Sequence, residues 1–228
     1  MSLSILSRFF PPKKLQPAEQ SGAASPDSDR KRVLNVGGNN KEASIPSVYD
    51  GWLNVVLDID PTGRPDVVCD ARELVSLAPH AYESIYCSHN LEHYFRHDVA
   101  KVLAGFMHVL KEDGFVYIRV PDMGQLMQQV VREGLDIDDF LYSSPMGPIT
   151  VRDVIYGHAG EIESSGSDFY AHKTGFTPKS LVAALANAGF PFLYMTTDYL
   201  EVTAFAFIEE PSADMMASLN IAAAAPAA

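Results

Sequence analysis

Short apolar runs recur through the first half of this chain, and they constrain its fold more than any other feature. They read RVLNV, WLNVVLDID, DVVCD, ESIYCS and GFVYIRVPD. All but the third combine β-branched or aromatic residues with a polar exit, which is typical of parallel strands buried on both faces. Two further strands, at residues 192–197 and 202–208, have so little chain between them that they must form an antiparallel hairpin.

The sequence predicts two helices, one between these runs and one after them. Residues 91–110 carry apolar side chains at spacings of three and four, which predicts one helix that ends at KEDG. The stretch TGFTPKSLVAALANAGF predicts a second. Thr177 can cap it, Pro178 suits its first position, and Gly189 suits the position after its last turn.

The links between the first strands are short. Pro46 interrupts the link from Gly37 to the second strand, and the link from Asp60 to Asp66 has no room for a helix, although parallel crossovers normally need a dozen or more residues. We therefore predict an α/β fold: an abridged Rossmann-like three-layer sandwich, with a mostly parallel sheet closed by an antiparallel C-terminal hairpin.

The ends of the chain and one internal stretch lack this alternation of strand and helix segments. Residues 1–30 hold prolines and small polar residues, which predicts a mobile lead-in, and residues 211–228 predict a disordered tail. The domain then spans residues 31–210. Within it, residues 134–175 are long and irregular but rich in aromatics and histidine, which predicts an ordered lid or substrate loop.

Charge and cysteine content limit the classes of partner and the cellular compartment that the sequence predicts. The net charge is −12 and the pI about 4.9, the wrong sign for binding nucleic acid through its phosphates. No segment approaches the roughly 18 apolar residues of a membrane span. Two cysteines, Cys69 and Cys87, form no disulfide framework and suit a reducing compartment, so we expect a cytoplasmic protein. The oligomeric state stays open.

The polar strand ends predict a ligand site. In open parallel sheets, ligands bind at the carboxyl ends of the strands. Gly37 and Gly38 follow the first strand and let the backbone lie close to a ligand. Asp58 ends the second strand and suits a ribose, because one carboxylate can accept from both hydroxyls. Asp70 and the small Ala71 follow the third strand and would flank an adenine.

From residue 33 to residue 208 the sequence resembles the class I S-adenosylmethionine-dependent methyltransferases. The likeness rests on VLNVGGNN, LDIDP, CDARELVSL, ESIYCSHNLEHYFRHDVAKVLAGFMHVLKEDGFVYIRVPD and HKTGFTPKSLVAALANAGF. The nearest branch contains small, type-11-like methyltransferases linked with glycan and small-molecule pathways. Two positions depart from the pattern: Asn39 replaces a third glycine, and Asn35 replaces an acidic residue.

The resemblance implies methyl transfer to a small-molecule or glycan acceptor, with S-adenosylmethionine as the cofactor. The residues that it predicts for the cofactor are Gly37, Gly38, Asn39, Asp58, Asp70, Ala71, Ser88 and His89. Its departures favour one alternative, a non-catalytic binding or scaffold subunit of the same fold. A nicotinamide-binding domain is disfavoured because GGNNK lacks the G-x-G-x-x-G spacing and a helix to receive a pyrophosphate.

Histidines are the candidate catalytic groups. His89 lies at the exit of the fourth strand, where the sulfonium of the methyl donor would lie, and the insertion could bring His172 down from above. Both are predicted as general bases. HNLEH also fits the zinc motif H-x-x-E-H, which requires both histidines on one helical face. Because a strand runs up to Ser88, we predict no metal here.

Overall fold

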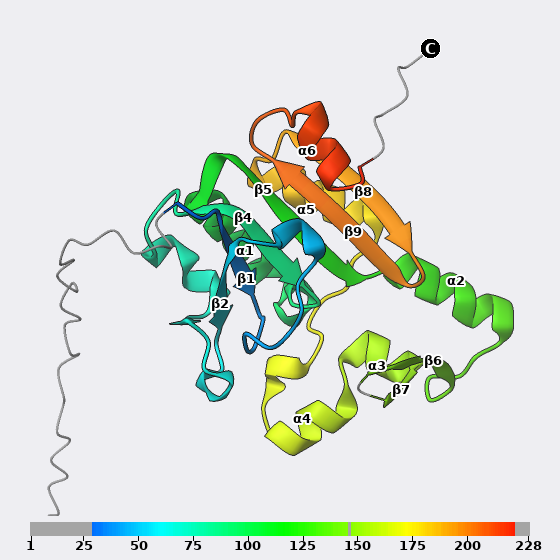
Figure 1. The fold of residues 1–228 in the computed structure, drawn as a ribbon. Coiled ribbons are helices and arrows are strands. Elements are labelled where there is room, and N and C mark those ends of the chain that lie inside the picture. The colour runs from blue at the N-terminus through cyan, green and yellow to red at the C-terminus, as the bar shows by residue number, and fades with distance from the viewer. Residues whose placement is uncertain (1–28, 146, 222–228) are drawn as a thin grey trace, which may run out of the picture.

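A seven-stranded sheet in the order β3-β2-β1-β4-β5-β9-β8 forms the centre of the computed structural model, which describes residues 29–145 and 147–221 (Figure 1). Five strands run parallel: β1 (Arg32–Val36), β2 (Leu53–Asp58), β3 (Val67–Val68), β4 (Tyr82–Ser88) and β5 (Leu110–Pro121). A hairpin of β8 (Phe192–Asp198) and β9 (Glu201–Phe207) adds antiparallel to β5. The predicted fold class, with its closing hairpin, is confirmed.

Two helices cover one face of the sheet, α1 (Arg96–Val109) and α5 (Pro178–Ala188) (Figure 1). The stops predicted for α5 are present: the Thr177 side chain accepts from the Ser180 N–H, and Gly189 takes the left-handed conformation. The start predicted for α1 is wrong. Residues Leu91–His93 form a separate 3₁₀ turn, η4, and the backbone at Phe95 is extended, so the α-helix begins only at Arg96.

Among the described residues, the other face carries only short elements, as the brief links predict. In place of crossover helices the chain forms η1 (Ser47–Tyr49) between β1 and β2, and η2 (Pro61–Gly63) between β2 and β3. The link from β3 to β4 holds η3 (Ala71–Ser76), which packs against α1 on the first face. Aromatic side chains fill the second face.

The C-terminal segment differs from its prediction. Helix α6 (Ala213–Ser218) packs on the second face, and Leu219 and Ile221 behind it are buried (Figure 1). Apolar contact with the sheet orders this segment, so the domain extends at least to residue 221. The rest of the predicted tail and most of the predicted lead-in, residues 1–28, lie outside the described residues.

The predicted irregular insertion contains regular structure and starts earlier than residue 134. It holds α2 (Met123–Glu133), β6 (Phe140–Ser144), β7 (Gly147–Thr150), α3 (Val151–Tyr156), α4 (Ala159–Ser165) and η5 (Asp168–Tyr170). A small apolar core of its own includes Leu126, Ile149 and Val154. Its two ends meet, because Asp122 and Phe176 form a parallel bridge beside the end of β5.

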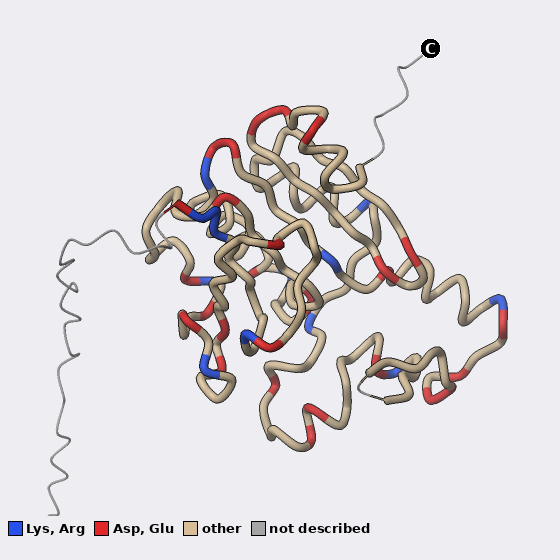
Figure 2. The backbone as a smooth tube through the Cα atoms, in the orientation of Figure 1, with Lys and Arg blue, Asp and Glu red and all other residues tan. Residues whose placement is uncertain are grey.

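Charge is spread unevenly over the backbone. Figure 2 shows Lys and Arg in short, separate segments between more numerous acidic ones. Among the described helices, none has the length and apolar character that crossing a membrane requires.

The packing of α1 on the sheet should dominate stability. Phe106 is fully buried among β-strand and α5 side chains, so Phe106→Ala should lower the free energy of unfolding by about 3–5 kcal/mol. Phe140 is 57% exposed, and Phe140→Ala should change the free energy of unfolding by at most about 0.5 kcal/mol. Urea denaturation followed by circular dichroism measures both. Equal losses would show that α1 does not close the main core.

Candidate functional site

A cavity of about 280 Å³ opens at the carboxyl ends of the parallel strands. It lies where the strand order turns, since β1 has β2 on one side and β4 on the other. Its walls come from the exits of four strands and from the end of the insertion: Gly37, Asn39, Asp58, Ile59, Asp60, Asp70, Arg72, His89, Asn90, His93, Tyr94, Phe95, Asp98, Asp168, Phe169, Tyr170 and Lys173.

The glycine loop after β1 is tightly packed against neighbouring side chains. Gly37 has φ +73°, and a Cβ there would overlap the Asn90 side chain. A Cβ on Gly38 would overlap the side chain of the buried Asn35. Asn39 takes a left-handed conformation with φ +55°, which asparagine tolerates better than most residues. The loop therefore keeps a sharp turn without a third glycine.

Asp58 stands between this loop and the chain that follows β2. Its Oδ2 accepts from the Asn39 N–H at 3.0 Å, and its Oδ1 accepts from the Asp60 N–H at 2.9 Å. A carboxylate has about four lone-pair sites, so two acceptor positions remain for a ligand in the cavity.

Asp70 has a partner that the sequence analysis did not identify. Arg72 binds its carboxylate through Nε at 3.0 Å and NH2 at 2.6 Å, and NH1 of Arg72 reaches Asp98 at 3.3 Å. Burial opposes ionisation of Asp70, but the hydrogen bonds and charge of Arg72 outweigh it and hold the pKa of this carboxyl below its usual value. The structure therefore places an ion pair where we expected an acceptor free for an adenine.

Three predicted cofactor residues do not line the cavity. Ala71 is buried behind it with 1% exposure, Gly38 faces Asn35, and Ser88 ends β4 just before the cavity begins. Gly37, Asn39, Asp58, Asp70 and His89 do line it. The strand ends thus bring together residues from positions 37 to 89, as expected for parallel strands.

The lining is acidic. Three cationic side chains, Arg72, Lys173 and the protonated His89, stand against five carboxyl side chains: Asp58, Asp60, Asp70, Asp98 and Asp168. This excess of negative charge favours a ligand that carries positive charge in the cavity.

His89 adopts a rare conformation at the exit of β4. Its φ is +48°, and its Nε2 lies 3.0 Å from Oε2 of Glu201. Burial lowers the pKa of His89, but the hydrogen bond to Glu201 and the nearby charges of Glu92 and Glu201 outweigh that effect and raise it to about 9. A strained backbone at a cavity wall is common at functional sites, because surrounding contacts must hold it.

Glu201 was also missed by the sequence analysis. It begins β9 and pairs with Arg119 of β5 through two hydrogen bonds of 2.9 Å. Only the antiparallel register of β5 and β9 brings it to the exit of β4, 112 residues away along the chain. No local signal in the sequence could have indicated this.

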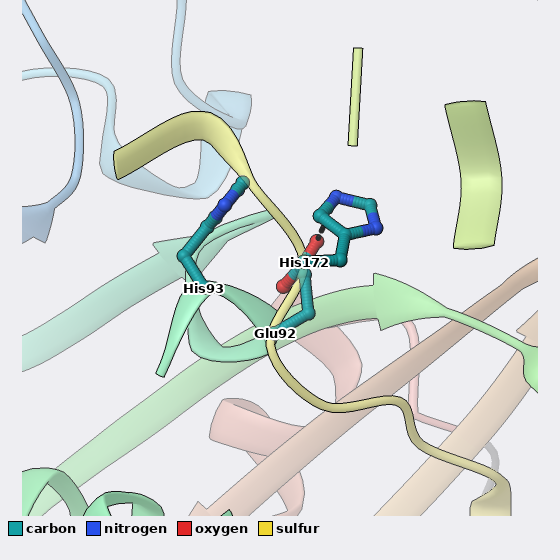
Figure 3. A group of neighbouring side chains, drawn as sticks. All are labelled: Glu92, His93 and His172. Atoms are coloured by element: carbon teal, nitrogen blue, oxygen red, sulfur yellow. Dashed lines mark ion pairs between the residues drawn. The ribbon is translucent and has the colours of Figure 1, made fainter. Parts of the chain in front are cut away.

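Behind His89 lies a second group of titratable residues, Glu92, His93 and His172 (Figure 3). His93 lines the cavity, whereas Glu92 is 1% exposed and His172 lies outside the lining. The Glu92 carbonyl accepts from the N–H groups of Lys173 and Thr174 at 2.8 and 3.1 Å, which fastens the end of the insertion to η4. The insertion thus brings His172 beside η4, whereas a catalytic role for it stays a prediction.

Comparison with known proteins shows likeness at the level of fold. The sequence matches no known family profile, and no curated protein sequence is similar to it. Among solved structures, the PH0226 protein from Pyrococcus horikoshii OT3 has 13% identity and a TM-score of 0.50 over 78% of this chain and 82% of its own.

Two further similar structures are methyltransferases. One is a SAM dependent methyltransferase from Archaeoglobus fulgidus, with 15% identity and a TM-score of 0.49 over 79% of this chain and 87% of its own. The other is the 1,6-didemethyltoxoflavin-N1-methyltransferase of Burkholderia thailandensis, crystallised with S-adenosylhomocysteine, with 16% identity and a TM-score of 0.45 over 78% and 71%.

The pair of Arg119 and Glu201 should hold the strand ends together. Glu201→Gln leaves the half-buried Arg119 and His89 without their shared carboxylate, so it should lower the free energy of unfolding by about 1–3 kcal/mol. Glu42→Gln, at an exposed position, should change it by less than about 0.5 kcal/mol. If urea denaturation finds the two variants equally stable, the pair contributes nothing measurable.

Proposed function

We propose that this protein is an enzyme that transfers a methyl group from S-adenosylmethionine to a small acceptor. One observation carries the proposal: five of the eight residues that the methyltransferase resemblance predicts for the cofactor line one cavity, at the point where the strand order turns. Ligands of open α/β sheets bind at such points. The shared fold of PH0226 agrees with this reading without specifying a ligand.

The charge of the cavity supports the same ligand class. S-Adenosylmethionine carries a sulfonium cation, and the lining has five carboxyl groups against three cationic side chains, Arg72, Lys173 and the protonated His89. Asp58 keeps two free acceptor positions, which suits the two hydroxyls of a ribose.

The acceptor is proposed to be a small molecule or a glycan, approached from the side of the insertion. Methyl transfer is an in-line displacement at the sulfonium carbon, so the main task of the protein is to hold the acceptor about 3–3.5 Å from that carbon. His89 is positioned at the cavity wall and His172 behind it. Their roles as catalytic residues remain predictions. His89, whose pKa is raised to about 9, is protonated at neutral pH and could act as a base only once it loses that proton. Two free cysteines, Cys69 and Cys87, accord with the proposed cytoplasmic location.

Calorimetry tests the cofactor directly. S-Adenosylhomocysteine and NAD are titrated separately into the full chain, and we expect binding of the first alone. Binding of NAD alone would overturn the proposal in favour of a dinucleotide site. Binding of neither would favour the alternative, a non-catalytic subunit with a methyltransferase-like fold.

Asp58 should be the main anchor of the ribose. Asp58→Asn removes the charge and half of the acceptor capacity, so affinity for S-adenosylhomocysteine should fall by about 2–3 kcal/mol, or roughly 30- to 150-fold. Asp50→Asn, at an exposed position before β2 and outside the cavity, serves as the control and should bind like the native protein. An unchanged affinity of Asp58→Asn would remove Asp58 from the cofactor site.

The end of the insertion should act as a lid. Helix α4 and η5 contain no buried residues, yet Asp168, Phe169 and Tyr170 line the cavity. A protease that cleaves after glutamate should cut at Glu161 or Glu163 in the free protein, and saturating S-adenosylhomocysteine should slow that cut several-fold. Gel analysis of the time course, with an exposed site at Glu209 after β9 and outside the cavity as the internal reference, measures the effect. Equal slowing at both sites would indicate general stabilisation without a lid.

A further inference from the structure

The carboxylate of Glu92 lacks hydrogen-bond partners in a buried position. The residue is 1% exposed, and neither Oε1 nor Oε2 has a hydrogen-bond partner among the described residues. A buried ionised carboxylate is costly unless it is paired or coordinates a metal, so its surroundings should contain a compensating group. Three histidines surround it, His89, His93 and His172.

His172 faces this carboxylate with its unprotonated nitrogen. Its Nδ1 lies 2.9 Å from the Val154 carbonyl and donates to it, because a carbonyl can only accept. In the neutral ring Nε2 then carries a lone pair, and it lies 4.0 Å from Glu92 Oε1 (Figure 3). A cation between these two acceptors, which face each other across 4 Å, would be stabilised by both of them. Histidine ligands of metals typically donate their other N–H to a carbonyl or carboxylate, as His172 does.

His93 completes the group from the other side. Its ring packs edge-on against that of His172, with 4.9 Å between the centroids. Nδ1 lies 3.1 Å from the Ala171 carbonyl and Nε2 lies 3.1 Å from the His89 carbonyl. A neutral ring has one N–H and can donate to only one of these carbonyls, so the other nitrogen can serve as a ligand once the ring turns away from the carbonyl that it faces.

The three ligand atoms are close to metal-binding geometry. They lie within 4.8 Å of one another. Around a tetrahedral zinc ion at about 2.0–2.2 Å, ligand atoms are roughly 3.3–3.6 Å apart. The separation of Glu92 and His172 therefore has to close by about half an ångström, and a separation at the 4.8 Å limit by about 1.2–1.5 Å. Backbone hydrogen bonds already hold both segments, because the Glu92 carbonyl accepts from Lys173 and Thr174.

His89 offers the competing explanation, that its charge alone neutralises the carboxylate. Its Nδ1 lies 3.6 Å from Glu92 Oε1, which is longer than a hydrogen bond, and its Nε2 is engaged with Glu201. This contact therefore leaves both oxygens of Glu92 unsatisfied, and it does not account for the orientation of His172.

We propose that Glu92, His93 and His172 bind a divalent transition-metal ion at the junction of η4 and the insertion. Two imidazoles and one carboxylate form a set that suits zinc and the neighbouring ions of its row, whereas Mg²⁺ and Ca²⁺ prefer all-oxygen sites. The ion neutralises the buried carboxylate and ties the insertion to the end of β4. The site does not depend on the proposed methyl transfer.

The test uses the full chain, without an affinity tag and stripped of metal by a chelator. Zn²⁺ is titrated against a chromophoric competitor, and we expect one ion per chain with a Kd of micromolar or below. At a hundredfold excess over Kd the ion should raise Tm by about 5–10 °C. Co²⁺ in its place should give the visible absorption bands of a tetrahedral or five-coordinate site.

Three variants locate the site. His172→Ala and Glu92→Gln should each weaken Zn²⁺ binding at least a hundredfold and abolish the Co²⁺ bands. His97→Ala is the matched control: this histidine is 75% exposed on α1, four residues after His93, and its loss should leave Kd unchanged. Circular dichroism checks that each variant folds.

The proposal fails if the native protein binds Zn²⁺ no better than His172→Ala does, or if His97→Ala abolishes binding, which would assign the ion to a surface pair of His93 and His97. A carboxylate with a purely ionic role gives a third pattern: Glu92→Gln lowers Tm without added metal, and Zn²⁺ changes Tm in neither protein. That pattern would overturn the proposal even where a variant folds poorly, because the native protein alone reports the effect of Zn²⁺.

Discussion

The backbone carbonyl of Glu92 is the contact on which the site depends. It accepts from two successive N–H groups of the insertion, Lys173 and Thr174. Close by, the N–H of Met123 donates to the Phe176 carbonyl, so both ends of a segment of some fifty residues are fastened beside β5. Because Asp168, Tyr170 and Lys173 form one wall of the cavity, this fastening determines whether the cavity exists.

Buried charge joins three strands at the same edge. Arg119 of β5 and Glu201 of β9 form a paired hydrogen bond, and Glu201 also binds His89 at the exit of β4. Burial raises the pKa of Glu201, but His89 and Arg119 outweigh it and keep this carboxyl ionised with a lowered pKa. Each member compensates the desolvation of another, so the network holds His89 in its left-handed conformation.

Local signals allowed much of the fold to be predicted. The strand runs, the hairpin and the stops of α5 at Thr177 and Gly189 depend on neighbours in sequence, and all are present. The start of α1 was missed because the apolar periodicity continues through η4, although the backbone at Phe95 is extended. Helix α6 was missed because its order comes from packing against the sheet, which an alanine-rich tail does not indicate.

The candidate site could be predicted only in part from the sequence, because several of its contacts depend on three-dimensional packing. Parallel strands bring their carboxyl ends to one edge, so Gly37, Asp58, Asp70 and His89 could be grouped before their contacts were known. The pairing of Asp70 with Arg72 depends on side-chain geometry within one turn, and Glu201 reaches His89 only through the register of the hairpin. The spacing of apolar residues in the sequence gives no information on either of these two contacts.

The short link after β1 also limits the ligand. A dinucleotide-binding fold places a pyrophosphate at the N-terminus of the helix that follows this strand, where free N–H groups point at the anion. Here the only helical element between β1 and β2 is the three-residue η1, and its Tyr49 is buried on the opposite side of the sheet against Phe115 and Trp52. Aromatic rings thus take the volume of the missing helix, so β1 is followed by no helix whose N-terminus could face the cavity. The helix start that lines the cavity is that of α1, with Phe95 and the Asp98 carboxylate. What faces it instead is Asp58, held by two backbone N–H groups, together with four further carboxyl side chains. An abridged sheet of this kind is poorly equipped for a pyrophosphate and well equipped for a compact ligand with hydroxyl donors and positive charge.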